Sequence, residues 1–368
     1  MNIKASITGI EYKVHLANEL EKLDLKNFDI NKSPTSCLVA DKKKIFAISK
    51  WVSPKRTRSY PYERIYNTLS NSKKITVIPI VKDEGFEGER DFIQWDTVSL
   101  MSLLDVYVIL GYYNQAKKHK TRVNKITKQQ FDNEYIISKI REISNYHSSA
   151  LHWNLNEINT NLPNIIDKVK SSYNLIENKL KVKLHNEKGL DIFKEEISED
   201  VKLFMKFSRQ KAMEAQKREL QTIQPKESLQ TLTKATITIN NYLGGKYFLT
   251  VDEVIITNEN ISLIESKHSK SALFPSKSDI KDGLLKMILF CNLKNVFIDN
   301  LNFKHIPILK LTSSNIIEGN INSNSQTSEI NQFFEHNKFK NSHKLFLTKL
   351  FEEAQENNFI VILQKGQI

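Results

Sequence analysis

Two carboxylates and an ammonium group in the last third of the chain are spaced so that they could act on one substrate. Asp252 follows the apolar run FLTV, and Glu265 and Lys267 stand two positions apart in the strand-like run ISLIESKHS. Successive side chains of a strand point to opposite faces, so Glu265 and Lys267 share a face. Carboxylate oxygens suit a hard divalent cation, and an ammonium group beside them can orient an attacking water. The set is a candidate for metal-assisted hydrolysis at a phosphate.

The turn NEN between the two strands decides whether Asp252 faces Glu265. If the turn is centred between Asn258 and Glu259, residues whose numbers sum to 517 lie opposite each other, and Asp252 pairs with Glu265. Two carboxylates about 5 Å apart repel unless a cation lies between them. This register predicts Mg2+ held by Asp252 and Glu265, with Lys267 assisting the water. A three-residue turn would place Glu253 opposite Glu265 instead, so Glu253 stays the alternative ligand.

The surrounding residues predict the elements that position this set. Residues 233–269 alternate in polarity and predict a three-stranded meander, with LGG and NEN as turns. A helix is expected at 278–293, with Ser278 as its N-cap and an apolar face. Strands at 295–300 and 306–311, helices near 328–356 and a final strand follow.

These residues together resemble a known family. The pair VD at 251–252, the ESK at 265–267 and the order helix, three strands, helix, strand are similar to the PD-(D/E)xK nuclease superfamily, and especially to its type II restriction endonucleases. Val251 takes the place of the motif's leading proline. The resemblance covers residues 225–300 and implies a central mixed sheet flanked by helices.

The resemblance also implies a function. It assigns metal binding to Asp252 and Glu265 and a catalytic role to Lys267. It further implies magnesium-dependent, sequence-specific cutting of double-stranded DNA by a homodimer in the bacterial cytoplasm. A nuclease of repair, recombination or a mobile element is one alternative. A non-catalytic DNA-binding protein, in which these charges form a structural ladder, is the other.

Further charged residues near this motif have less defined roles. The family often adds an acid from the helix that precedes the first strand, where Glu214, Glu219 and Glu227 are available. Lys281 and Lys286, on the helix that follows, could approach a phosphate. For all of these a solvated helix face is the simpler interpretation.

The length of 368 residues predicts two or three packed units of a mixed α/β protein. Residues 1–115 mix strand-like and helical runs and predict an α/β unit for DNA recognition. Residues 116–224 contain little Gly or Pro and predict a helical segment that contacts DNA or dimerises. Residues 225–368 form the predicted nuclease domain.

The charge balance favours a polyanion as partner. Lys and Arg number 54 against 42 Asp and Glu, which gives a net charge of +12. Two basic clusters could neutralise phosphates, and their arginines could read guanine. The first holds Lys55, Arg56, Arg58 and Arg64, and the second holds Lys117, Lys118, Lys120 and Arg122. The acidic stretch at 83–96 predicts a loop that repels DNA from another face.

Several function classes lack support in the sequence. The longest apolar run, 98–113, is interrupted by Asp105 and is too short to span a bilayer, so no membrane association is expected. No phosphate-binding or dinucleotide-binding glycine pattern occurs, so no nucleotide cofactor is expected. The two cysteines, Cys37 and Cys291, offer no disulfide framework, which fits a reducing cytoplasm.

Overall fold

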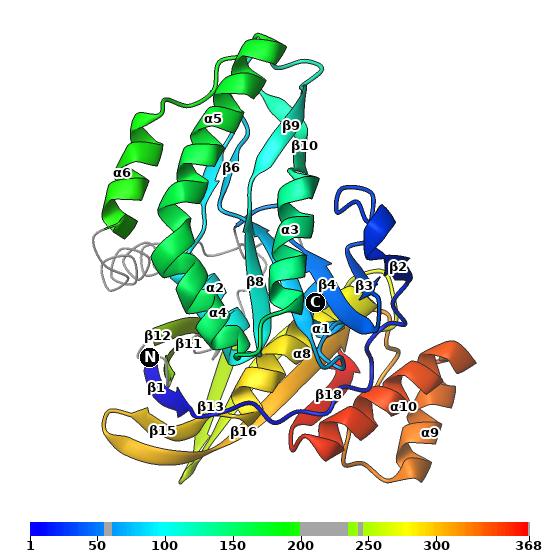
Figure 1. Ribbon diagram of the computed structural model, residues 1–368. Helices are drawn as coiled ribbons and strands as arrows, with labels where there is room; N and C mark the ends of the chain where they lie inside the picture. The colour runs from blue at the N-terminus through cyan, green and yellow to red at the C-terminus, as the bar shows by residue number, and fades with distance from the viewer. Residues whose placement is uncertain (55–60, 199–234, 242–245, 367–368) are drawn as a thin grey trace. The chain divides into compact units, whose positions relative to one another are not determined.

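The first eighteen residues fold with the last third of the chain rather than with the residues that follow them. The computed structural model describes residues 1–54, 61–198, 235–241 and 246–366. We call Met1–Asn18 together with Met213–Ile368 the split unit, and Glu19–Ala212 the inserted unit. Both units combine helices with sheets, which confirms the predicted mixed α/β class (Figure 1).

The split unit contains the larger sheet. Its strands are β1 (Asn2–Ile7), β11 (Ala235–Asn241), β12 (Lys246–Val251), β13 (Glu253–Thr257), β14 (Asn260–Ser269), β15 (Lys294–Ile298), β16 (Leu301–Ser313), β17 (Asn320–Asn322) and β18 (Ile360–Lys365). The main path runs β12-β11-β1-β15-β16-β14-β13, and β18 and β17 continue from β16. The strands β14, β16 and β18 are parallel to one another.

The predicted meander needs correction at its middle strand, which is divided at Asp252 into β12 and β13, so that residues 235–269 form two hairpins. β11 pairs with β12, and β13 pairs with β14. The two hairpins lie at opposite ends of the strand order. Asp252 alone separates β12 from β13 in the chain, so the sheet must curl until its two ends meet at that residue. Asp252 thus lies between two strands rather than inside one.

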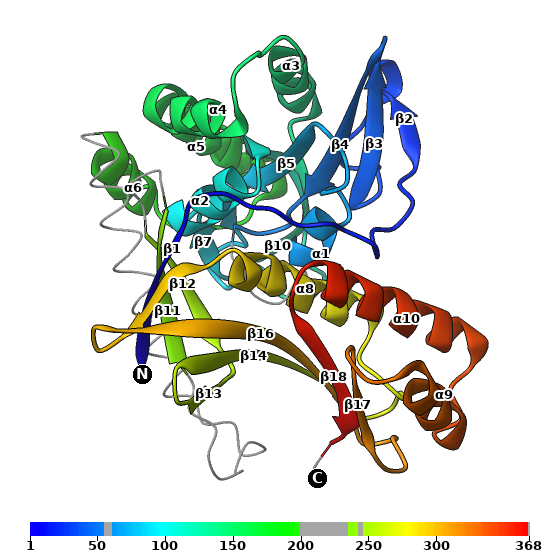
Figure 2. The same cartoon turned by 90° about the horizontal axis from the view of Figure 1, so that it is seen from below.

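Helix α8 (Lys277–Cys291) covers β14 and β16, and Figure 2 shows it lying across them. Its N-cap is Ser276, whose hydroxyl accepts a hydrogen bond from the Asp279 amide at 3.1 Å, so the predicted cap at Ser278 is wrong by two residues. The apolar face of α8 is buried as expected, with Ile280, Leu284 and Met287 fully covered. Helices α9 (Thr327–His336) and α10 (Asn341–Glu356) complete the unit, and α10 packs beside β18.

The inserted unit has its own sheet, in the order β2-β3-β4-β5-β8. These strands are β2 (Lys22–Asp24), β3 (Ser36–Asp41), β4 (Lys44–Lys50), β5 (Lys74–Pro79) and β8 (Val106–Gly111). Two short ladders join β6 (Val81–Asp83) to β7 (Arg90–Phe92) and β9 (Tyr113–Lys118) to β10 (Ile126–Phe131). The helices and helical turns are η1 (Leu25–Asn27), α1 (Pro61–Tyr66), α2 (Trp95–Leu103), α3 (Asn133–Ser144), α4 (Ala150–Asn156), η2 (Glu157–Asn161), α5 (Leu162–Leu180) and α6 (Lys188–Ser198).

The predicted boundary between residues 115 and 116 falls inside β9 and needs correction. One hydrophobic core joins strands of the first hundred residues, through Val39 and Ile75, to the helices α3 and α4, through Ile140 and Trp153. The basic segment after 116 is therefore a β-hairpin of this unit, not the start of a helical domain. At the other end, the pairing of β1 with β11 and β15 assigns the first residues to the split unit.

Among the described residues, the helices include none with the length and apolar character needed to cross a bilayer.

Candidate active site

The β13–β14 hairpin has the register that the sequence predicted. Glu253 pairs with Ile264 and Ile256 with Ile261, so opposite residues sum to 517. Asn258 adopts a φ of 50° in the two-residue turn, the left-handed conformation that asparagine tolerates better than most residues. Continuing the register by one residue puts Asp252 opposite Glu265. The Asp252 Oδ2 atom accepts a hydrogen bond from the Ser266 amide at 3.0 Å, which fixes that carboxylate against β14.

Glu265 is the centre of the cluster and is only 2% exposed. Its Oε1 atom lies 3.0 Å from the Lys267 Nζ atom, and its Oε2 atom lies 2.6 Å from the Lys286 Nζ atom. Burial raises the pKa of Glu265, Lys286 and Lys267 oppose that rise, and the nearby charge of Asp252 adds to it. Pairing offsets part of the cost of burying a carboxylate, and here both oxygens contact ammonium groups.

Lys267 joins β14 to α8. Besides Glu265, its Nζ atom contacts the Asp282 Oδ2 atom on α8 at 2.9 Å. Burial alone would lower the pKa of Lys267, but the charges of Glu265 and Asp282 raise it above its ordinary value. Lys267 therefore stays an ammonium group at neutral pH. It can donate hydrogen bonds and offset negative charge, but it cannot accept a proton from water.

Helix α8 supplies two charged residues that sequence reasoning placed differently or missed. Asp282 and Lys286 are four residues apart, so they lie on one helix face, and both point to β14. The sequence predicts at most a phosphate contact for Lys286 and no role for Asp282. The signal that could have found them is a charged pair at this spacing within an otherwise apolar helix face.

Gly283 explains how α8 approaches the cluster so closely. A Cβ atom built at Gly283 would lie 2.7 Å from the Leu309 Cδ1 atom and 3.4 Å from the Lys267 Cε atom. Only a residue without a side chain leaves room for the helix against these groups. The cluster is thus enclosed between the sheet and the helix, where charges interact more strongly than in water.

The alternative ligand Glu253 lies on the opposite face of the sheet. Its Oε2 atom forms an ion pair with the Lys310 Nζ atom at 3.0 Å, away from Glu265. The two-residue turn therefore decides between the two registers in favour of Asp252. Lys281 is also separate, because it is buried and its Nζ atom donates to the Asn18 Oδ1 atom at 2.6 Å. Glu214, Glu219 and Glu227 lie outside the described residues.

The donor set is compatible with a divalent cation. Among the described residues there is no group of three or more His, Cys, Asp or Glu side chains arranged to hold a metal. Mg2+ needs only one or two carboxylates, because it keeps waters and phosphate oxygens as its other ligands. Counted as ionised, Asp252, Glu265 and Asp282 exceed the two lysines by one negative charge. A cation bound here must displace an ammonium group from Glu265.

The residues predicted to bind DNA fall into three groups. Lys55, Arg56 and Arg58 lie outside the described residues. Arg64 lies on α1, where its Nη1 atom donates to the Lys50 carbonyl at 2.6 Å and burial lowers its pKa, so it holds the strand end rather than facing solvent. The second cluster is exposed on the β9–β10 hairpin. Its members are Lys117, Lys118, Lys120 and Arg122.

Comparisons with protein-family models, with curated proteins and with solved structures give no match to this chain.

Proposed function

We propose that this protein is a magnesium-dependent endonuclease that hydrolyses phosphodiester bonds of double-stranded DNA. The observation that carries the proposal is the hairpin register, which brings Asp252 beside Glu265 on the face that also holds Lys267. The three side chains that the sequence predicts to act together thus belong to one cluster. A merely solvated ladder on an edge strand would leave Glu265 exposed, and it is buried.

The position of the cluster in the sheet gives further support. Glu265 and Lys267 lie in the second half of β14, which is followed in the chain by α8, by β15 and then by β16, the strand that pairs with β14 in parallel. Ligand sites of open α/β sheets gather near the carboxyl ends of parallel strands.

Each residue has a distinct proposed role. Asp252 and Glu265 would hold Mg2+, which when bound supplies a polarised water and positive charge at the scissile phosphate. Lys267, as an ammonium group, orients the attacking water and offsets charge that develops on the phosphate. Asp282 holds Lys267 in place from α8. Lys286 neutralises Glu265 until a cation replaces it.

Double-stranded DNA is the proposed substrate because of charge. The net charge of +12 attracts polyanions, and the exposed lysines of the β9–β10 hairpin offer phosphate contacts. Cutting at a specific sequence, a homodimer and a place in the bacterial cytoplasm are proposed from the resemblance to type II restriction endonucleases.

The test is cleavage of supercoiled plasmid DNA in MgCl2 and in EDTA. The wild-type protein should cut only with magnesium. Lys267→Ala should slow cutting about 10²- to 10³-fold, the loss expected when one transition-state donor is removed. Lys310→Ala is the matched control, because it breaks an ion pair of the same kind on the opposite face of the same sheet. Discrete fragments indicate a restriction enzyme, and a smear indicates a repair or recombination nuclease.

One observation favours a different function. Both oxygens of Glu265 contact ammonium groups, as in a structural ion-pair network. In that case the protein binds DNA without cutting it. The wild-type protein would then leave plasmid intact in magnesium, and Lys267→Ala would lower the stability of the fold without changing DNA affinity.

A further inference from the structure

The inserted unit contains a pocket that the proposed cleavage does not use. Its volume is about 330 Å³, near the small end of the range for ligand sites, so it suits a single ring system rather than a large molecule. The pocket lies between the loop after β6, the second half of α5 and the segment that leads into α6. Its wall includes Asp83, Phe86, Lys170, Tyr173, Lys183 and His185.

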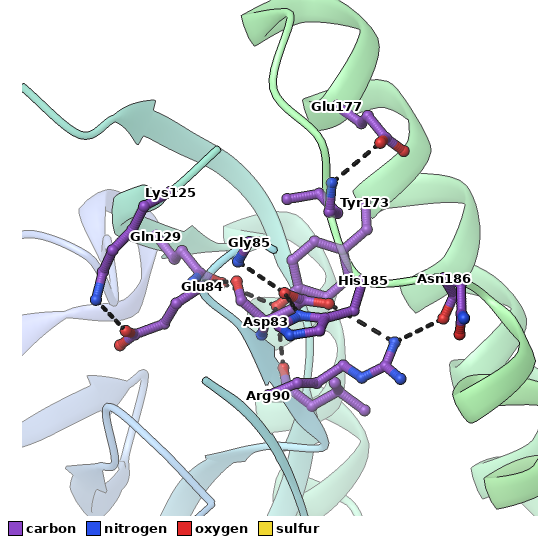
Figure 3. A network of polar contacts seen from close by, with 12 residues as sticks. Asp83, Glu84, Gly85, Arg90, Lys125, Gln129, Tyr173, Glu177, His185 and Asn186 are labelled. Carbon is purple, nitrogen blue, oxygen red and sulfur yellow. Dashed lines mark hydrogen bonds and ion pairs between the residues drawn. The ribbon is translucent and has the colours of Figure 1, made fainter. Parts of the chain in front are cut away.

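An aspartate and a histidine that both line this pocket, Asp83 and His185, contact each other (Figure 3). Asp83 is 3% exposed, so it is not part of the DNA-repelling loop that the sequence predicted. Its Oδ1 atom accepts hydrogen bonds from the Gly85 amide and from the His185 Nδ1 atom, each at 2.8 Å. Arg90 approaches the other oxygen at 3.7 Å. The carboxylate is therefore held by several donors and cannot turn.

This arrangement sets the direction of the hydrogen bond at the Nδ1 atom of His185. A carboxylate only accepts hydrogen bonds, so Nδ1 donates to Asp83, and in a neutral ring the proton lies on Nδ1. The Nε2 atom is then an acceptor with a set direction, and no partner for it occurs in the part of the chain that the structure describes. Tyr173 supports the wall from below, since its hydroxyl accepts from the Asp83 amide at 3.0 Å. The pocket thus presents one positioned acceptor to a ligand.

An exposed aromatic ring stands at the entrance. Phe86 lines the pocket and is 59% exposed. The ring centroid of Phe86 lies 6.5 Å from that of His185. The Lys183 Nζ atom lies over the Phe86 ring, 5.1 Å from its centroid. A flat ring entering the pocket can stack on Phe86 while a cation stays close to any attached phosphate.

The basic β9–β10 hairpin is built onto the same entrance. The Glu87 amide donates to the Asn124 carbonyl at 3.2 Å, and the Lys183 amide donates to the Asn124 Oδ1 atom at 2.9 Å. Gly85, at a φ of 94°, permits this contact, because a Cβ atom there would lie 2.3 Å from the Asn124 carbonyl oxygen. The Arg122 Nη1 atom also donates to the Glu87 carbonyl at 3.4 Å, so the exposed hairpin loop that carries Lys120 and Arg122 adjoins the segment that carries Phe86.

We infer that the pocket receives one nucleobase extruded from DNA that the hairpin holds by its phosphates. The Phe86 ring stacks on the base, and the Nε2 atom of His185 accepts a hydrogen bond from an exocyclic amino group of that base. The cations around the entrance hold the phosphates of the DNA backbone. Adenine, cytosine and guanine carry such an amino group, and thymine does not. This inference rests on the proposed function only in its choice of DNA as partner.

The experiment compares two labelled duplexes of the same sequence, one fully paired and one with a single unpaired adenine. An unpaired base costs less to extrude, so the bulged duplex should bind about tenfold tighter by fluorescence anisotropy in EDTA. Phe86→Ala and His185→Ala should remove this preference. Lys120→Ala should weaken both duplexes equally. Leu175→Ala truncates an exposed apolar side chain on α5 outside the pocket, and it should change neither the affinity for the two duplexes nor the preference between them.

Equal affinity for the two duplexes overturns the inference, as does a preference that survives Phe86→Ala. An unpaired thymine that binds as tightly as an unpaired adenine removes the role of His185. The measurement uses no metal and no cleavage, so it separates the two proposals. Plasmid cutting without the bulge preference supports the nuclease proposal and overturns the inference about the pocket. The bulge preference without plasmid cutting supports the inference about the pocket and overturns the nuclease proposal.

Discussion

At the scale of single residues, Lys286 poses the sharpest question about the candidate active site. Its Nζ atom is 2.6 Å from Glu265 and 3.3 Å from the Thr250 carbonyl. Burial lowers the pKa of Lys286, but Glu265 and Asp252 raise it more. This lysine therefore stands where a cation between the two carboxylates would have to bind.

Lys286→Met tests that competition. Without the metal, the variant should lose about 3–5 kcal/mol of unfolding free energy, because a buried carboxylate loses one of its two partners. With the metal, the vacated oxygen of Glu265 should bind Mg2+ more tightly, so thermal stabilisation should begin at a lower MgCl2 concentration than in the wild type. Lys310→Met should show no such shift. If the midpoint of thermal unfolding does not change with magnesium in the wild type or in Lys286→Met, the cluster is structural.

At the scale of elements, the local geometry around Glu265 could be predicted from sequence and the longer-range pairing could not. The turn at Asn258 sets the β13–β14 register between residues that are close in the chain. The apolar face that carries Ile280 and Leu284 follows from helical spacing, which is also a local pattern. The jump at Asp252 from one end of the sheet to the other has no local signal. The β9–β10 hairpin was hidden because lysine and glutamine replace the alternating apolar residues that mark strands.

His305 links two elements of the split unit and should make its stability depend on pH. The residue lies on β16, and its Nε2 atom contacts the Phe290 carbonyl in the last turn of α8 at 2.8 Å. Burial lowers the pKa of His305 below its ordinary 6.5. The unfolded chain therefore binds the proton first, so stability is complete above pH 6.5 and falls as the pH drops toward the folded pKa. Urea titrations between pH 8 and 5 should show this loss, and His305→Gln should flatten it. An unchanged slope in the variant would assign the pH dependence to other groups.

At the scale of the whole molecule, the chain starts in one unit, builds the other, and returns to the first. β1 pairs in parallel with β11, from Asn2 with Thr236 to Ile7 with Asn241, and antiparallel with β15. Nothing in the first residues indicates a partner more than two hundred positions away, which is why the sequence assigned them to an N-terminal domain. The split unit can close its sheet only after the whole chain is present.

Ile3→Ala tests this division. Ile3 is fully buried within β1, so its truncation should cost about 2–5 kcal/mol. The loss should appear in the split unit, as faster amide hydrogen exchange in β14 and α8, while β5 and β8 of the inserted unit keep their protection. Lys4→Ala, on the same strand but exposed, should leave exchange unchanged. Equal loss of protection in both units would show that they unfold as one cooperative body. Loss confined to the split unit would mean that a residue near the start of the chain supports the strand carrying Glu265 and Lys267. In that case Ile3→Ala should also weaken magnesium-dependent cutting, while the DNA affinity of the inserted unit stays unchanged.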